Sequence, residues 1–113
     1  MAERRMFAKS VVLDDKFSDL PLSARVLYFT LGMEADDDGF VGAPRRAMRQ
    51  CGVNKQALQV LIDAGYLRSF DGGVVYIQHW TTNNQIRKDR YRPSVYRKEL
   101  MEVVFDAVPV NPV

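Results

Sequence analysis

Two short helical segments separated by only two residues, Gly52 and Val53, restrict the fold of this chain more than any other feature. Pro44 suits the first turn of a helix that we predict over residues 44–51, and Gly52 then breaks the chain. Asn54 can cap a second helix over residues 54–64, because its side chain can accept a hydrogen bond from a free backbone N–H. Two helices joined by so few residues predict a helix-turn-helix.

The segments on either side of this pair indicate what surrounds it. A helix over residues 23–35 precedes the pair, since apolar residues recur there at helical spacing, and the short strand Phe40-Val41 follows that helix. After the pair we predict strands over residues 66–70 and 74–80, joined by the turn residues Asp71-Gly72-Gly73. The other segments are expected to be extended over residues 6–12, turn-like over residues 13–20 and helical over residues 94–105.

This order of elements predicts an α+β fold, namely a winged helix-turn-helix in which a three-helix core carries a β-hairpin wing, with a C-terminal helix added. A βαβ unit fits poorly, because the two convincing strands are consecutive and joined by a hairpin turn. We divide the chain into a winged-helix DNA-binding domain (residues 1–93), a helix that packs on it or mediates association (residues 94–106), and a linker or tail (residues 107–113).

Positive charge is concentrated in one part of the sequence. The whole chain carries a net charge of only +2, but residues 45–98 hold eleven Lys and Arg against three Asp, a net charge of +8. A one-sided positive region is the pattern expected of a protein that binds a polyanion. The sequence therefore favours nucleic acid as a partner.

The remaining composition indicates a cytoplasmic protein that does not enter a membrane. No apolar run approaches the roughly 20 residues that a transmembrane helix needs. The first residues, Met1 to Arg5, are not followed by the apolar region of a signal peptide. Cys51 is the only cysteine, so an internal disulfide is excluded and a reducing compartment is expected.

The predicted helix-turn-helix supplies candidate DNA contacts. Its second helix should present an exposed face to the major groove, and that face carries Lys55, Gln56 and Gln59, with Asp63 at its end. The helix before it offers three side chains to backbone phosphates, Arg45, Arg46 and Arg49. The wing tip has no cation, so we expect the wing to stay out of the DNA groove or to contact protein. The alternative is that all these side chains are simply the solvated sides of two helices.

A basic and aromatic segment follows the hairpin, from Asn84 to Tyr96. Its candidate nucleic-acid contacts are Arg87, Lys88, Arg90, Tyr91 and Arg92. Cations neutralise phosphates and aromatic rings stack on bases, so we expect this segment to return along the domain and widen the basic face of the helix-turn-helix. The alternative is a solvated helix end in which Ile86 and Tyr91 mainly pin the final helix to the core.

Residues suited to catalysis or metal binding are few. His79 is the only histidine and lies on a predicted strand, and Cys51 lies at a helix end, so we expect both to be packing residues. One Cys and one His cannot build a structural zinc site. The acidic run from Glu34 resembles the start of a calcium loop, but its twelfth position, which should be Glu, is Arg45. We therefore expect no enzymatic activity, no cofactor and no metal.

Several blocks of the sequence resemble one known family in both order and spacing. The blocks are Ala2 to Phe7, Pro21 to Tyr28, Ala35 to Val41, Gly73 to Val75, His79-Trp80 and Ile86 to Tyr91. Over Ala2 to Glu99 the chain is similar to the N-terminal winged-helix domain of phage and prophage replisome-organiser proteins, which are related to DnaD-type replication initiation proteins.

The resemblance implies a non-catalytic domain that binds double-stranded DNA and helps to open or mark a replication origin. Related N-terminal domains also associate, so a second expectation is an oligomerisation or docking module that contacts its own copies or other replication proteins. A third expectation is a winged-helix transcriptional regulator, since it would share the fold and the electrostatics and nothing in the residues excludes it.

Overall fold

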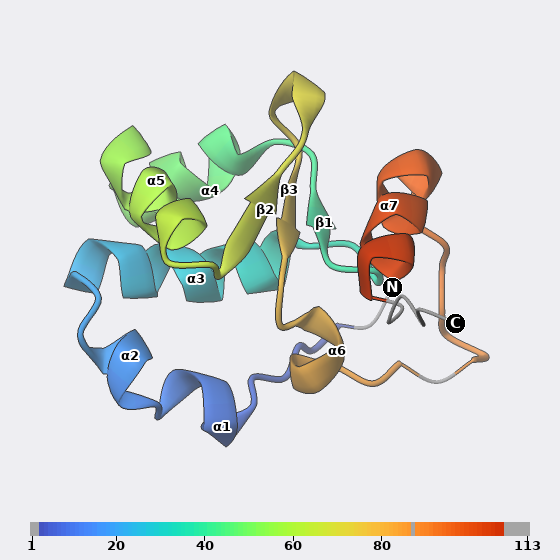
Figure 1. Ribbon diagram of the computed structural model, residues 1–113, viewed down its shortest axis with the longest axis horizontal. Helices are drawn as coiled ribbons and strands as arrows, with labels where there is room; N and C mark the ends of the chain where they lie inside the picture. Colours follow the sequence, from blue (N-terminus) through green and yellow to red (C-terminus); the bar gives the residue numbers. More distant parts are fainter. Residues whose placement is uncertain (1–2, 87, 108–113) are drawn as a thin grey trace, which may run out of the picture.

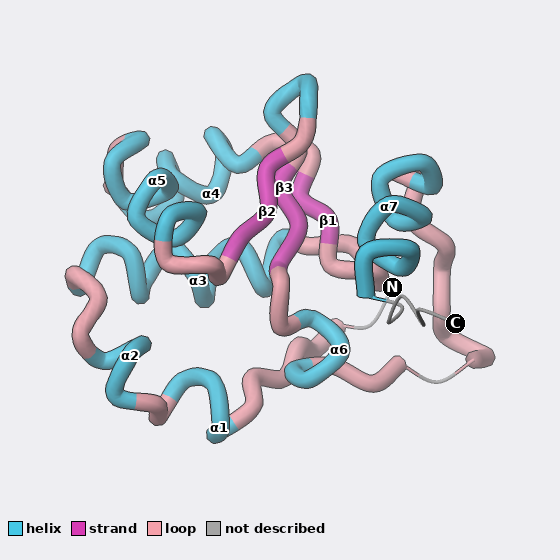
Figure 2. The backbone as a smooth tube through the Cα atoms, in the orientation of Figure 1, coloured by secondary structure: helices cyan, strands magenta, loops and turns pink. Residues whose placement is uncertain are grey.

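The computed structural model describes residues 3–86 and 88–107. These residues form seven α-helices and one three-stranded antiparallel sheet, so the predicted α+β class is confirmed (Figures 1 and 2). The helices are α1 (Lys9–Val12), α2 (Asp15–Ser18), α3 (Leu22–Glu34), α4 (Pro44–Cys51), α5 (Lys55–Asp63), α6 (Trp80–Asn83) and α7 (Arg97–Ala107). The strands are β1 (Phe40–Val41), β2 (Leu67–Ser69) and β3 (Val75–Ile77), and a 3-10 turn, η1 (Asp71–Gly73), joins β2 to β3.

Helix α3 is the centre of the hydrophobic core, because α4 and α5 both pack against it. Its buried residues Ala24, Leu27, Tyr28 and Leu31 follow the apolar stripe that predicts the helix, and each is 0% exposed. The rings of Phe17 and Tyr28 lie 5.2 Å apart edge to face, so α2 closes one end of this core. The three-helix arrangement thus buries the residues that the helical spacing selects.

The break between α4 and α5 has the predicted local structure. Gly52 adopts a left-handed conformation with φ 71°, which ends α4. Asn54 then caps α5, since its side chain accepts a hydrogen bond of 3.0 Å from the Gln56 backbone N–H. Both residues act on neighbours close in sequence, which is why the sequence alone could locate the turn.

The sheet has the strand order β1-β3-β2, with both pairs antiparallel. Phe40 pairs with Tyr76, and Leu67 pairs with Ile77. In Figures 1 and 2 the sheet stands between the helices α3, α4 and α5 on one side and α7 on the other. All three residues of β3 are buried, because this strand is central and both of its faces are covered.

Two predicted extended segments contain helical turns. Residues 9–12 form α1 rather than an extended entry. The second hairpin strand ends at Ile77, and Trp80–Asn83 forms α6 instead of continuing the strand. The helical turn brings two side chains to buried partners: Trp80 Nε1 donates to the Asp37 carbonyl, and Asn83 Nδ2 donates to the Tyr28 hydroxyl, both at 2.9 Å.

Helix α7 begins at Arg97, three residues later than predicted. Ser94 cannot join the helix because it is held elsewhere: its backbone N–H donates to Asp38 Oδ2 at 2.8 Å and its hydroxyl donates to Asp36. The helix then packs beside the sheet, where Arg68 of β2 forms a 2.6 Å ion pair with Asp106. Apart from Ala107, the predicted tail over residues 107–113 lies outside the described residues. None of the described helices combines the length and the apolar character needed to cross a bilayer.

Candidate nucleic-acid interface

A groove lies between α4, α5 and the tip of the β2–β3 hairpin. It is lined by Arg45, Arg46 and Arg49 of α4 and by Lys55 and Gln59 of α5. The residues that line this groove include no Asp or Glu. The structure thus brings five of the predicted DNA contacts to one concave surface, which we call the basic groove.

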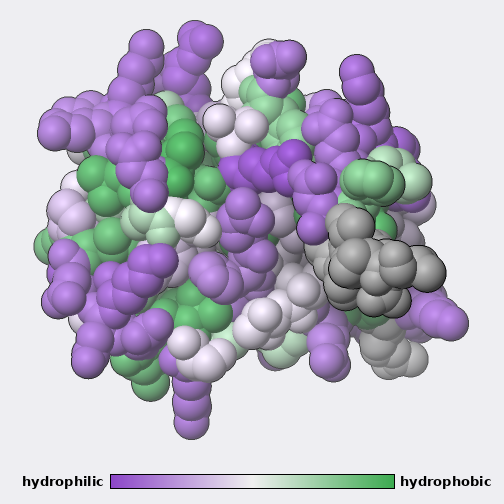
Figure 3. Space-filling model, in the orientation of Figure 1, coloured by the Kyte–Doolittle hydropathy of each residue, from purple (hydrophilic) through white to green (hydrophobic). Residues whose placement is uncertain are grey.

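The cationic side chains of the basic groove are available to solvent. All of them are exposed, and hydrophilic side chains cover the upper left of the molecule over α4 and α5 (Figure 3). Arg46 Nε lies 3.8 Å from Glu34 Oε1, but its side chain is 77% exposed. Exposed ion pairs of this kind contribute about 0–1 kcal/mol, so Glu34 does not prevent Arg46 from meeting a phosphate.

Helix α5 directs Lys55 and Gln59 into the groove because Ala57 and Leu61 face the core. Gln59 Nε2 donates a 2.8 Å hydrogen bond to Asp63 Oδ1, one helical turn later. Asp63 therefore orients the Gln59 amide and leaves its carbonyl oxygen free to accept a hydrogen bond.

Gln56, the sixth candidate on these two helices, does not line the basic groove. It lies in a separate hollow beside Pro21 and Ser23, at the start of α3. Helical spacing predicts that Gln56 lies on the exposed side of α5. It cannot predict which of the two hollows beside this helix Gln56 lines.

The wing tip borders the basic groove through backbone only. Gly72 and Gly73 line it, both with positive φ, and neither has a side chain to insert between DNA strands. The wing tip thus borders the basic groove, while its expected absence from the DNA groove stays a prediction. Any phosphate contact that it makes would use backbone N–H groups.

The basic segment after the hairpin lies elsewhere. In Figure 1 its turn, with Lys88 and Arg90, is at the opposite end of the long axis from α4 and α5. The structure therefore does not bring this segment to the basic groove, contrary to the expectation that it widens that face. Arg87 lies outside the described residues.

The segment is held in this position by the loop that follows α3. The Tyr91 hydroxyl donates to both carboxylate oxygens of Asp38, at 2.8 and 2.7 Å, and the Arg92 backbone N–H donates to Asp37 Oδ2 at 3.0 Å. The hydrogen bond to Asp38 raises the pKa of Tyr91, because losing the proton would place two anions together. Tyr91 thus ties the segment to the loop after α3.

A buried ion pair anchors the same loop to the N-terminal segment. Arg5 Nη2 lies 3.0 Å from Asp37 Oδ1, and the two side chains are 2% and 0% exposed. The Arg5 guanidinium also lies 5.1 Å above the Trp80 ring. Burial by itself would raise the pKa of Asp37, but the hydrogen bonds from the Arg92 backbone and Arg5, together with the Arg5 charge, outweigh it and lower this pKa.

The loop residues Asp36 to Asp38 are the main structural feature that the sequence interpretation misses. It compares them with the start of a calcium loop and does not predict an internal ionic contact, although three consecutive acidic residues are followed by many cations in the sequence. Asp36 Oδ1 accepts hydrogen bonds from the Asp38 and Phe40 backbone N–H groups, both at 3.0 Å. Across the described ranges, no group of three or more His, Cys, Asp or Glu side chains could hold a metal ion.

His79 and Cys51 lie away from the basic groove and contact packed neighbours. The His79 ring is 5.4 Å from the Tyr66 ring, and burial, together with the nearby Lys16 charge, lowers the pKa of His79. Cys51 Sγ lies 2.9 Å from the Thr30 hydroxyl. Both environments are those of packing residues.

Comparison of the chain with protein-family models, with curated proteins and with solved structures found no match. Its function must therefore be argued from its own residues and geometry.

Proposed function

We propose that this chain is a winged-helix domain that binds double-stranded DNA without catalysing a reaction. The observation that carries the proposal is the basic groove, in which four cations and Gln59 from two helices share one surface without an acidic side chain. The element order α3-β1-α4-α5-β2-β3 and the strand order β1-β3-β2 support the winged-helix assignment.

The two helices take different roles in this proposal. Arg45 and Arg49 of α4 neutralise backbone phosphates and set the position of the protein on the duplex. Lys55 and Gln59 lie on α5, the helix that enters the major groove in folds of this type, and their side chains meet base edges. A good bidentate base contact contributes about 1–3 kcal/mol of discrimination, so Gln59 matters more for sequence preference than for overall affinity.

The proposal is tested by measuring duplex affinity over a series of salt concentrations. Three phosphate contacts, from Arg45, Arg46 and Arg49, predict a slope of log K against log salt of about −2.7, and the double variant Arg45→Ala/Arg49→Ala should lower its magnitude by about 1.8. The double variant Lys88→Ala/Arg90→Ala is the matched control, because it removes the same charge at the opposite end of the molecule. The control should leave the slope unchanged.

Two results would contradict the proposal. One is the absence of duplex binding by the wild-type chain at ~50 mM salt, where phosphate contacts are strong. The other is an equal loss of slope in the two double variants, which would mean that charge acts without regard to the groove.

We further propose that this duplex binding serves the initiation of DNA replication. The support is the order and spacing of the sequence blocks that resemble replisome-organiser proteins, from Ala2 to Glu99. Footprinting on the chromosomal or phage region that encodes the chain tests this assignment. Protection of an array of repeats is expected for an origin, whereas protection of a single promoter operator would favour a transcriptional regulator.

A second candidate function is association with further copies of the chain or with other replication proteins. Helix α7 favours it, because Met101, Val104 and Phe105 are 63, 50 and 78% exposed and lie at helical spacing on one face. Hydrophobic atoms are visible on α7 at the right of Figure 3. This function is compatible with duplex binding, since α7 and the basic groove lie on different sides of the sheet.

A further inference from the structure

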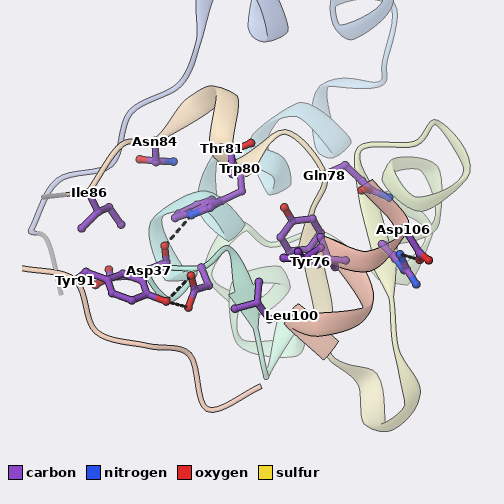
Figure 4. Close-up of a pocket in the computed structure, with 14 residues that line it drawn as sticks. Asp37, Tyr76, Gln78, Trp80, Thr81, Asn84, Ile86, Tyr91, Leu100 and Asp106 are labelled. Carbon is purple, nitrogen blue, oxygen red and sulfur yellow. Dashed lines mark hydrogen bonds and ion pairs between the residues drawn. The ribbon is translucent and has the colours of Figure 1, made fainter. Parts of the chain in front are cut away.

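A cavity of about 870 Å³ lies between the sheet and α7, away from the basic groove (Figure 4). Its walls come from β3, α6, α7 and the segment that follows α6. Pockets that bind small molecules have volumes of this order. Nothing in the proposed duplex contact uses this cavity.

Half of the residues that line the cavity are aromatic or aliphatic. Tyr91 and Ile86 lie on one side, Trp80 and Tyr76 lie across from them, and Leu100 of α7 lies at another edge (Figure 4). Tyr91 is the most accessible of the three aromatic residues, with 37% of its surface exposed. A flat ring can therefore stack on Tyr91 while its edges reach the interior of the cavity.

The wall also contains polar groups that can donate hydrogen bonds. Asn84 is only 9% exposed, and its Nδ2 has no hydrogen-bond partner among the described residues. The Met6 backbone N–H donates to Asn84 Oδ1 at 2.9 Å, which fixes the orientation of the amide. The Tyr76 hydroxyl points into the cavity, and both burial and the Asp38 carboxylate raise the pKa of Tyr76, so it remains a neutral donor. Buried donors of this kind favour a ligand that carries acceptors.

The charges of the wall restrict the class of ligand. Its carboxylates are already paired, Asp37 with Arg5, Asp38 with Tyr91 and Arg97, and Asp106 with Arg68. A cationic ligand would thus find each carboxylate already paired, and an anionic group would find the cation of the wall, Arg68, already paired with Asp106 and Glu102. A wholly apolar ligand would leave the Asn84 amide unsatisfied. An uncharged ring with hydrogen-bonding edges meets all these conditions.

We propose that this cavity binds an unpaired nucleobase, which stacks on Tyr91 and presents its edge to Asn84 and Tyr76. The attached phosphate stays outside the cavity, within reach of Lys88 and Arg90. Both side chains are exposed and lie between the wall residues Ile86 and Tyr91 in the sequence. The base can belong to a single strand or to a free nucleotide. The inference is independent of duplex binding, since the two sites share no residue.

The test uses the single tryptophan of the chain, Trp80, as a fluorescent reporter inside the cavity. The full chain is titrated with a deoxyadenylate oligomer in one arm and with deoxyadenosine monophosphate in the other. Saturable quenching is expected in at least one arm. Quenching only by the oligomer assigns a single strand that also needs the Lys88 and Arg90 charges, whereas equal quenching by the monophosphate assigns a free nucleotide.

Substitutions at Tyr91 separate stacking from folding. Tyr91→Ala should weaken binding in the responding arm by about 5- to 150-fold, the loss expected for one stacked base. Tyr91→Phe keeps the ring but removes the hydroxyl that bonds Asp38, so it should retain more of the affinity than Tyr91→Ala. Duplex binding by Tyr91→Ala should equal that of the wild type, and Arg45→Ala/Arg49→Ala should show the reverse pattern, so failure at one site is distinguishable from failure at the other. No fluorescence change in either arm, or an unchanged affinity in Tyr91→Ala, would overturn the inference.

Discussion

At the scale of single residues, Gly39 couples the loop after α3 to α6. It has φ 91°, and a Cβ atom at this position would lie 2.5 Å from Trp80 Cγ. Gly39→Ala should therefore lower the free energy of unfolding by about 2–4 kcal/mol, from a left-handed backbone that costs about 1–2 kcal/mol and from overpacking against the indole. Urea unfolding followed by circular dichroism measures this loss.

Gly72→Ala is the matched control for that substitution. Gly72 has φ 84°, but a Cβ atom there would meet nothing within 4 Å. Only the backbone contribution remains, so the expected loss is about 1–2 kcal/mol. Equal losses at the two glycines would show that contact with Trp80 is not what excludes a side chain at Gly39.

Residues that act on near neighbours could be read from the sequence, and residues that act over long separations could not. Asn54 caps the N–H of Gln56 two residues away, so composition predicts it. Arg5 pairs with Asp37, which is 32 residues away in the sequence. This pairing is possible only after α6 and the loop after α3 have packed together, so local sequence patterns cannot predict it. The positions of Gln59 in the basic groove and Gln56 outside it depend in the same way on which helices flank α5.

At the scale of elements, the loop Asp36 to Asp38 holds together three separate segments. Asp37 pairs with Arg5 of the N-terminal segment, accepts the Arg92 backbone N–H, and its carbonyl accepts from Trp80 of α6. Asp37→Asn would leave the Arg5 guanidinium buried without its counterion, so the free energy of unfolding should fall by about 3–5 kcal/mol at neutral pH. Chemical denaturation at pH 7 measures this difference.

The same carboxylate should make stability depend on pH in the acidic range. The folded-state pKa of Asp37 lies below its ordinary value of 3.8. The ionised carboxylate therefore adds to the free energy of unfolding above pH 3.8, and this stabilisation is lost as the pH falls through the folded pKa. Asp37→Asn should reduce this acid-induced loss. The control Asp71→Asn changes an exposed carboxylate at the wing tip and should alter stability by no more than about 0.5 kcal/mol. An unchanged acid profile in Asp37→Asn would contradict the role of the ion pair.

Elements with strong periodicity or turn chemistry were predictable, and elements fixed by tertiary hydrogen bonds were not. The stripe of α3 and the glycine after α4 locate these helices to within a residue. Helix α6 has four residues and no helical periodicity, and it exists because Trp80 and Asn83 reach partners on α3 and the following loop. Residues 74–80 are apolar enough to resemble one strand, so their pattern could not show where β3 stops.

At the scale of the whole molecule, the two groups of cations lie at opposite ends of the long axis. The sequence places all of them within residues 45–98, and net charge along the chain cannot tell whether folding gathers or separates them. The acidic loop decides the outcome, because its contacts with Tyr91 and Arg92 direct the basic segment away from α4 and α5. One domain thus offers a basic groove on one side of the sheet and, on the other side, a cavity with an aromatic wall beside an exposed apolar helix.

The exposed face of α7 leads to a prediction about assembly. Phe105 is 78% exposed, whereas Phe29 on the exposed side of α3 already packs edge to face with Phe7 at 5.0 Å. If the chain associates, a contact through α7 would therefore bury more apolar surface than a contact through the exposed side of α3. Phe105→Glu should remove about 2 kcal/mol or more of apolar burial from each contact, which weakens association about 30-fold.

Multi-angle light scattering over a range of protein concentrations measures this effect. The wild type should exceed the mass of one chain at high concentration, and Phe105→Glu should remain monomeric with an unchanged unfolding transition. Leu22→Glu, at a 68% exposed site at the start of α3, is the control and should associate like the wild type. A wild-type chain that stays monomeric throughout would eliminate self-association. The α7 face would then be left to a different protein, because three adjacent exposed apolar side chains on one helix face mark an interaction surface.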